Sequence, residues 1–385
     1  MLVASSALLT VLVSAPTATT ATTIKRTNQT LNITDTLAWN SPIPLNPIVK
    51  TGKLKNGFTY FIAKHNLPEK RVFIHLVNKV GSVQETDEQH GLAHFLEHMN
   101  FNGLKHFPKN SIIDYLQKYG VNFGADLNAH TTFEETIYKL KIPSDNPELL
   151  KNSLQIARDW AQDATLEDEE INKERGIIVE EIRGLRDADN RMREQYYAPI
   201  MNYSKFAARR PIGTEEVVKN APTSVLKKFY KDWYRPDIEA IVIVGDIDKK
   251  QIEQEVIRLF SDMKMPNNPP VLEKYNLDLN QKNKFIVATD PEATKTSGEF
   301  IFKFKEIPFK TVGNYRYSII RSGFNSMMAN RMNDIKLMPN TPLNEITIKH
   351  DHLLGGVDIM DAYFSLKNED FETGFKTIQR ELMRF

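Results

Sequence analysis

The chain has 385 residues, of which 41% are hydrophobic, so it can bury a sizeable core and favours two domains over one. Its 50 Lys and Arg residues nearly balance its 49 Asp and Glu residues, and no basic stripe runs along the sequence, so we expect no nucleic-acid partner. The absence of cysteine excludes disulfides, thiol nucleophiles and Cys-ligated zinc, and leaves His, Asp and Glu as the side chains for a metal ion.

An apolar stretch opens the chain and precedes its first charged residue, Lys25. Residues 2–15 are long enough for the apolar region of a signal peptide but short for a membrane span. We predict a signal peptide over 1–21, no membrane span in the mature chain, and therefore an exported protein, periplasmic or extracellular. A disordered tail is the alternative. Residues 22–45, rich in Thr, Asn and Pro without periodicity, predict an extended leader.

Strand and helix patterns interleave through residues 46–263. Alternating apolar residues predict strands, and apolar residues three and four apart predict helices. The predicted strands cover 58–65, 71–82, 135–142 and 238–247. The predicted helices cover 90–101, 111–120, 147–163, 167–187, 223–233 and 248–260. This order predicts an α+β fold, because a doubly wound parallel sheet would alternate strictly.

A Pro- and Asn-rich stretch, 264–281, predicts a linker to a second α+β domain over 282–385. The second domain has predicted strands at 284–290, 297–306 and 355–367, and predicted helices at 312–331 and 371–385. Compared with the first domain it lacks a closing helix, strand and helix. We therefore expect the second domain to be incomplete at its C-terminus.

One predicted helix, in the stretch HGLAHFLEHMNFNG, carries two histidines four residues apart. On a helical wheel the apolar and polar side chains separate into two faces, with Leu92, Phe95, Leu96 and Met99 on one and His94, Glu97, His98 and Phe101 on the other. The spacing lets His94 and His98 reach one ion, with Glu97 beside them. H-x-x-E-H is the inverzincin motif. The alternative is a solvated His/Glu face.

The helix over 167–187 offers a third ligand, which a catalytic zinc typically needs. Its apolar arc consists of Ile171, Ile177, Ile178, Ile182 and Leu185, while Arg175, Glu180, Arg183 and Arg186 point outward. Glu174 and Glu181 fall within the apolar arc, seven residues and two turns apart, so we expect both to be buried. A buried carboxylate needs a cation or hydrogen-bond donors, which a metal or, alternatively, salt bridges at the core edge would supply.

Four further histidines have no clear ligand role. His65, His75 and His106 have no partner at ligand spacing, and we expect them to be surface or packing residues. His90 lies one turn before His94 but precedes Gly91 at the helix start, so the pattern leaves its direction open.

The stretches HGLAHFLEHMNFNG, FGADLNAHTTFEETIYKL and ERGIIVEEI resemble the insulinase/pitrilysin family of zinc peptidases, above all its long bacterial periplasmic members, and the likeness covers most of 46–385. The resemblance implies two homologous-type α/β-roll domains, each a mostly antiparallel sheet packed with helices. It also implies one Zn²⁺ per chain, with His94, His98 and Glu181 as ligands, Glu97 as general base and Glu174 supporting the site.

The resemblance further implies that 125–138 contains an edge strand on which the substrate is held. Asn128 and Ala129 match the positions that contact the substrate main chain. A strand added at a sheet edge is bound through its backbone and tolerates varied side chains. A plain loop between helix and strand is the alternative for this segment.

The expected function is that of a zinc-dependent endopeptidase that hydrolyses extended or unfolded peptides through an activated water and the Glu97 base. A non-catalytic or partner-dependent subunit is the alternative, although such subunits normally lose motif residues that are all present here. A structural zinc site is disfavoured because such sites are usually closed by four ligands and rich in Cys. Family members pair an active half with a degenerate half, whose substrate-binding Arg/Tyr pair we cannot place in this chain. We therefore expect a C-terminal half or a homologous partner chain.

Overall fold

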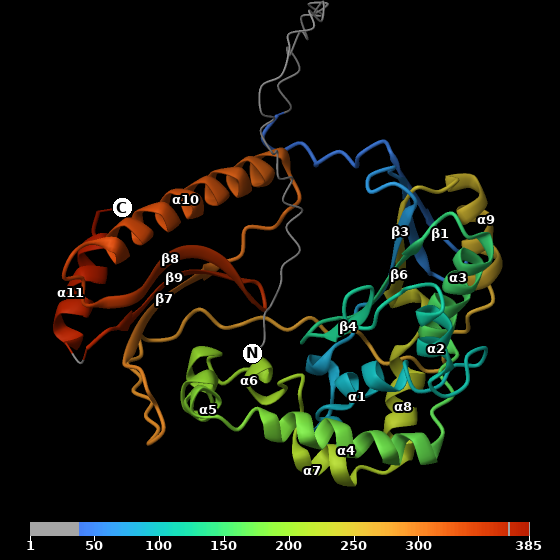
Figure 1. Ribbon diagram of the computed structural model, residues 1–385, viewed down its shortest axis with the longest axis horizontal. Coiled ribbons are helices and arrows are strands. Elements are labelled where there is room, and N and C mark those ends of the chain that lie inside the picture. The colour runs from blue at the N-terminus through green and yellow to red at the C-terminus, as the bar shows by residue number, and fades with distance from the viewer. Residues whose placement is uncertain (1–37, 369, 385) are drawn as a thin grey trace, which may run out of the picture.

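The computed structural model describes residues 38–368 and 370–384 (Figure 1). The predicted signal peptide and residues 22–37 of the predicted leader lie outside this range. No helix in the described part of the chain is long and apolar enough to cross a membrane. The described residues form two α+β units, as the sequence predicted, with a six-stranded sheet in the first unit and a three-stranded sheet in the second.

The first sheet has the strand order β1-β2-β6-β3-β5-β4 and is antiparallel except where β2 pairs with β6. Its strands are β1 (Val49–Lys53), β2 (Thr59–Lys64), β3 (Arg71–Asn78), β4 (Leu127–Thr131), β5 (Thr136–Pro143) and β6 (Glu239–Gly245). Every second residue of β3 and β5 is buried, which confirms the alternation seen in the sequence. The strand β4 lies at the end of the sheet, so one of its edges is unpaired within the sheet.

Nine α-helices accompany this sheet in the described residues. They are α1 (Leu92–Met99), α2 (Ser111–Gln117), α3 (Pro147–Gln162), α4 (Asp168–Gly184), α5 (Ala188–Ile200), α6 (Lys205–Ala208), α7 (Glu215–Asn220), α8 (Thr223–Trp233) and α9 (Lys249–Phe260). Side chains fix where several begin: Asn146 accepts a hydrogen bond from the Leu149 N–H at the start of α3, and Asp248 caps α9. The patterns missed α5, which buries only Asn190 and so has no apolar stripe. They also missed α6 and α7, which have only 4 and 6 residues.

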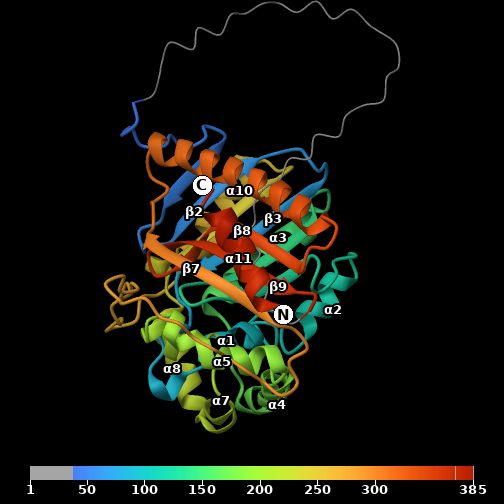
Figure 2. The same cartoon turned by 90° about the vertical axis from the view of Figure 1, so that its left-hand side faces the viewer.

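The second unit is a sheet of order β7-β9-β8 with two helices on one face (Figures 1 and 2). Its elements are β7 (Ser297–Lys305), α10 (Val312–Leu337), β8 (Leu343–Leu354), β9 (Val357–Leu366) and α11 (Phe371–Leu382). Side chains from both helices and all three strands form one apolar core, including Met332, Ile348, Phe364 and Ile378. In both views α10 lies at the opposite end of the molecule from α4, α5 and α7.

The strand predicted over 284–290 is wrong. This segment has no sheet neighbour, and Phe285 and Val287 are exposed, so its short apolar run is not a buried strand. It runs as coil beside α5, where Arg191 binds Asp290 through two hydrogen bonds. The patterns also missed β8, whose alternate residues are polar on the face away from the helices, and predicted α10 to end six residues too early.

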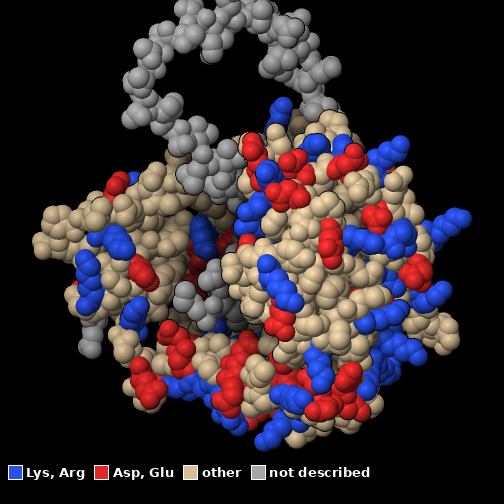
Figure 3. Space-filling view, turned by 45° about the vertical axis from the view of Figure 1, so that its right-hand side comes forward, with Lys and Arg blue, Asp and Glu red and all other residues tan. Residues whose placement is uncertain are grey.

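A third apolar cluster joins the two units. Its buried members are Val83, Met201, Phe206, Leu277, Val357 and Ile359. Leu277 comes from the segment predicted as a linker, and its N–H donates to the Gly355 carbonyl oxygen at 2.9 Å. The segment has no helix or strand, as a linker should, but it is docked along part of its length rather than free. Acidic and basic side chains intermingle over the face seen in Figure 3, in keeping with the near-zero net charge.

Replacing Leu277 with Ala should loosen the contact between the units. A buried leucine truncated to alanine typically loses about 2–5 kcal/mol of stability, and the lower end applies to a small cluster. We expect a lower unfolding midpoint and faster limited proteolysis within 264–296. Leu279→Ala is the matched control, because Leu279 is 37% exposed two residues further on. Equal proteolysis of the two variants would contradict docking through Leu277.

Candidate metal and active site

The helix that carries the HxxEH motif starts without a side-chain cap of its own. Gly91 occupies the N-cap position with φ +105°, a left-handed conformation that suits glycine. The carboxylate of Glu85 instead accepts hydrogen bonds from the N–H groups of Gly91 (2.9 Å) and Ala93 (2.8 Å). Glu85 is fully buried, and burial raises its pKa to about 8 even though these bonds oppose the shift. Glu85 was not predicted from the sequence, although a helix beginning at glycine signals that a cap comes from elsewhere.

A close contact further fixes this helix start. A Cβ added to Gly213 would lie 2.4 Å from the Gly91 Cα, so the two backbones touch because neither residue has a side chain. His90 points away from the motif, with its Nε2 3.2 Å from the Arg210 carbonyl oxygen. His90 is therefore outside the metal-ligand group.

The two faces predicted for α1 are those observed. Its apolar residues are buried, while His94, Glu97 and His98 are partly exposed. The imidazole centroids of His94 and His98 lie 4.7 Å apart with their planes at 81°. One turn of helix therefore presents both rings to the same space.

His94, His98 and Glu181 form the one group of three potential metal ligands found among the described residues. One ligand atom from each lies within 4.8 Å of the others. Glu181 Oε2 is 3.7 Å from His94 Nε2 and 3.6 Å from His98 Nε2. Tetrahedral zinc with bonds of about 2.1 Å places its ligand atoms roughly 3.4 Å apart, so this donor set fits a zinc ion.

Glu174 and Glu181 differ in exposure, which corrects the prediction that both are buried. Glu174 is buried, whereas the Glu181 side chain is 46% exposed and Ile177, in the same predicted apolar arc, is 58% exposed. The buried positions of α4 are in its first two-thirds, where it packs on α1, α7 and α8, while Arg183 and Arg186 near its end pair with Glu215 of α7. A helical wheel shows which positions share a face but not which face a neighbouring element covers.

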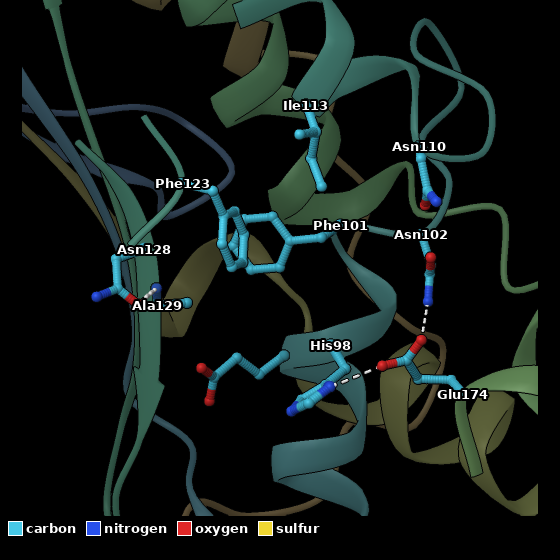
Figure 4. A pocket seen from close by; sticks show the side chains of 10 residues that line it. His98, Phe101, Asn102, Asn110, Ile113, Phe123, Asn128, Ala129 and Glu174 are labelled. Atoms are coloured by element: carbon cyan, nitrogen blue, oxygen red, sulfur yellow. Dashed lines mark hydrogen bonds and ion pairs between the residues drawn. The ribbon is translucent and has the colours of Figure 1, made fainter. Parts of the chain in front are cut away.

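Glu174 contacts His98 at Nδ1, the ring nitrogen that does not face Glu181. His98 Nδ1 donates to Glu174 Oε1 at 2.8 Å, and the Asn102 amide donates to Glu174 Oε2 (Figure 4). With Nδ1 bonded to Glu174, the Nε2 of His98 faces Glu181, the arrangement that metal-ligating histidines usually show. Glu174 is therefore in contact with a predicted ligand, and its supporting role stays a prediction.

Burial and neighbouring charges determine the protonation of His94, His98 and Glu181. Burial, and then the charge of His98, lower the pKa of His94 to about 4. Burial alone would lower the pKa of His98, but its hydrogen bond to Glu174 and its ion pair with Glu181 raise it to about 9. The hydrogen bond from His98 lowers the pKa of Glu181. At neutral pH the pair of carboxylates therefore keeps a proton on His98 that a metal ion must displace.

Glu97 lies beside the ligand group without belonging to it. Its Oε2 accepts a hydrogen bond of 2.6 Å from the Thr131 hydroxyl, at the end of β4. Burial raises the pKa of Glu97 to about 7, close to the value that suits a general base at neutral pH. Thr131 is a residue that sequence reasoning missed, because no helical or strand periodicity links position 131 to position 97.

A cavity of about 240 Å³ lies between α1 and β4. Its polar lining residues are Glu97, His98, Asn102, Asn110, Asn128 and Glu174, and its apolar ones are Phe101, Ile113, Phe123 and Ala129. Figure 4 shows Asn128 and Ala129 on one wall, His98 and Glu174 on the other, and Phe101 with Phe123 at one end. The structure thus brings all the predicted site residues to one region.

The three histidines predicted to be surface or packing residues lie elsewhere, and His65 is exposed. His106 Nδ1 is 2.9 Å from a carboxylate oxygen of the buried Asp159. His75 is on β3, where burial lowers its pKa to about 4. Neither belongs to the metal-ligand group.

Comparisons with known proteins agree with this geometry. The profile described as Insulinase (Peptidase family M16) matches residues 60–210, and that described as Peptidase M16 inactive domain matches 223–332. The chain is 33% identical to a "Probable zinc protease PqqL" of Haemophilus influenzae, covering 89% of this chain and 37% of the relative. It is 32% identical to a "Zinc protease PQQL-like" of Arabidopsis thaliana, covering 80% and 32%. The chain thus spans about a third of the length of these curated relatives.

Two solved structures are similar over most of the described chain. One is the first half of the periplasmic protease PqqL from Escherichia coli, with a TM-score of 0.71 and 25% identity, covering 86% of this chain and 71% of that one. The other is a mutant of the ferredoxin protease FusC in complex with Arabidopsis ferredoxin, with a TM-score of 0.72 and 28% identity, covering 90% and 38%.

Zinc binding at pH 7 should release protons. His98, with its raised pKa of about 9, is protonated at pH 7 and must lose about one proton to bind zinc, whereas His94 and Glu181 have lowered pKa values and are already deprotonated. Zinc affinity should therefore rise with pH up to about 9. Titration calorimetry in buffers of different ionisation enthalpy counts the protons. In Glu174→Gln the pKa of His98 should fall and the release at pH 7 should shrink; an unchanged release would contradict this cause.

Proposed function

Because the chain belongs to the insulinase family of zinc metallopeptidases, we propose that it is the metal-bearing part of a zinc-dependent endopeptidase. The family membership confirms the resemblance found in the sequence. The observation that carries the proposed activity is the convergence of His94, His98 and Glu181, with Glu97 beside them at the wall of a cavity. We infer one zinc ion per chain.

The proposed reaction is hydrolysis of a peptide bond by water. Zinc, when bound, polarises the scissile carbonyl and makes water more acidic. Glu97 takes the proton from the attacking water and returns it to the leaving amine, which its raised pKa suits. His94, His98 and Glu181 hold the ion, and Glu174 holds His98 in the correct tautomer through the 2.8 Å hydrogen bond. No covalent intermediate is needed.

The unpaired edge of β4 supports extended peptides as substrates. In an antiparallel pair, successive residues point their N–H and C=O groups alternately toward the partner strand and away from it. Thr132 and Asp126 each bond backbone groups on the β5 side, so Leu127, Ala129 and Thr131 direct theirs to the outer edge. A peptide strand could pair there through its main chain.

This edge is open over a short length. At one end, Leu127 already bonds Asn122 and Gly124. At the other end, Ser82 and Val83 bond the carbonyl oxygens of the two residues after Thr131. Ala129 and Thr131 are therefore the outward-facing residues of β4 that remain for a peptide.

Asn128 covers part of this edge. Its side-chain Oδ1 accepts from the Ala129 N–H at 2.8 Å, and its Nδ2 donates to the Gly124 carbonyl oxygen at 3.1 Å. We propose that a substrate carbonyl takes the place of the Asn128 oxygen, so that Asn128 and Ala129 bind the substrate main chain. An edge covered in this way is also protected from pairing with a second copy of the chain.

The alternative, a non-catalytic or partner-dependent subunit, is partly retained. Motif positions 94, 97, 98 and 181 are all filled, which favours an enzyme. Yet the relatives are longer, and the similar Escherichia coli structure is described as a first half. We therefore propose that activity depends on a C-terminal half or a homologous partner. We also propose export, since that relative is described as periplasmic.

Two variants should separate metal binding from catalysis. Glu97→Gln should retain zinc and lose nearly all turnover, because the amide cannot take a proton, whereas His98→Ala should lose both. Zinc content by atomic spectroscopy and cleavage of an unstructured fluorogenic peptide measure the two properties. Loss of zinc in Glu97→Gln would make Glu97 a ligand, and full zinc in His98→Ala would refute the ligand set.

Supplying the remainder of a full-length relative, fused or as a separate chain, should raise the peptidase rate of this chain at least tenfold, about 1.4 kcal/mol. The reason is that an opposing wall fixes the peptide against the β4 edge and the zinc ligands. Zinc content should not change. Equal specific activity of the chain with and without the added part would show that these residues suffice.

A further inference from the structure

Thr131 links the proposed base to the proposed substrate strand. It is the last residue of β4, and its hydroxyl donates to Glu97 Oε2 at 2.6 Å. Its Oγ1 also lies 3.4 Å from the hydroxyl of Thr136, which itself donates to the Val80 carbonyl oxygen at 3.0 Å. The proton of Thr131 is therefore committed to Glu97. A hydrogen bond thus joins the edge strand β4, which donates it, to Glu97 on α1.

Thr131 holds the buried carboxylate of Glu97 through its hydroxyl and its backbone N–H. Among the hydrogen bonds of the described residues, Thr131 is the one side-chain donor to Glu97. Glu97 sits in the last full turn of α1, which gives its carboxylate a choice of rotamers around a rigid backbone. A general base acts efficiently only when its oxygen is held within hydrogen-bond reach of the proton it takes. Glu97 lines the cavity, and with Oε2 held by Thr131 its Oε1 is the oxygen left to take a proton.

The same residue offers its main chain to a peptide. Thr131 is one of the two outward-facing residues of β4, and its N–H also interacts with the Glu97 carboxylate, so a peptide that pairs with the Thr131 carbonyl oxygen touches the residue that holds Glu97. Strand pairing fixes the backbone of Thr131 and with it the direction of the hydroxyl. The geometry thus brings peptide binding and orientation of the base together at one position.

We propose that Thr131 is a positioning residue that aligns Glu97 from the substrate-binding strand. The proposal rests on the proposed function, because it assigns Glu97 the role of base and β4 that of substrate strand. Thr131 itself touches neither zinc nor the proton that is transferred. Its removal should therefore lower kcat and leave zinc content and KM nearly unchanged.

The test compares two substitutions at this position in the zinc-loaded enzyme, completed by its C-terminal half or partner. Thr131→Val keeps the shape and the strand propensity but removes the donor, and should lower kcat about tenfold or more. Thr131→Ser keeps the hydroxyl, and its kcat should stay within about threefold of the original. A kcat equal to that of the original enzyme in Thr131→Val would overturn the proposal.

Two further variants exclude a general effect on the strand. Thr136→Val removes the neighbouring hydroxyl on β5, which bonds Val80 and not Glu97, so it should leave kcat within about threefold. If Thr136→Val lowers kcat as much as Thr131→Val, the effect comes from the strand and the proposal fails. In a Glu97→Gln background, Thr131→Val should have no further effect, since nothing is left to align.

The outcomes also distinguish the inference from the function on which it rests. If the completed wild-type enzyme shows no zinc-dependent cleavage, the proposed function is wrong. If it cleaves peptide and Glu97→Gln abolishes that cleavage while Thr131→Val does not lower kcat, the function stands and the role of Thr131 is refuted.

Discussion

The site depends on the way in which one short helix is fixed at its start. An α-helix of eight residues is too short to be stable by itself, yet α1 carries both imidazoles and the proposed base. The buried carboxylate of Glu85 ties down the first N–H groups, and the contact between Gly91 and Gly213 sets the direction of the chain. Because each helical residue turns by about 100°, an error at this start would carry His94 and His98 away from Glu181 together.

Much of the site could be predicted from sequence because it is local. The spacing of His94, Glu97 and His98 determines that they share a helix face, and the apolar residues of α1 show which face is buried. The fold class followed for the same reason, since β3 and β5 alternate cleanly and α3 and α9 are strongly amphipathic.

The rest depends on contacts between distant segments. Glu85 contacts α1 from a loop, and Thr131 contacts it from an edge strand. Helical or strand periodicity cannot predict such contacts between distant segments. The exposure of Glu181 depends on which face of α4 its neighbours leave uncovered, and a helical wheel does not give that information. The run over 284–290 looked like a strand because strands and exposed coil differ only in whether a neighbour is present. The strand β8 was missed for the opposite reason. It pairs with β9, but the polar residues on its exposed face make its sequence look unlike a strand.

The short open edge of β4 also has a kinetic consequence. Of the four backbone groups on its two outward-facing residues, the Ala129 N–H is bonded to Asn128 and the Thr131 N–H interacts with Glu97, which leaves two carbonyl oxygens. At about 1 kcal/mol for each hydrogen bond, these two would contribute roughly 2 kcal/mol, which corresponds to a dissociation constant of about 30 mM. With typical association rates, a peptide held by this edge alone would leave in less than about a millisecond. Such an edge would bind many different peptides, each for a short time. Discrimination among them then falls to side-chain contacts that lengthen the residence time, for which the cavity beside Glu97 is the nearest place.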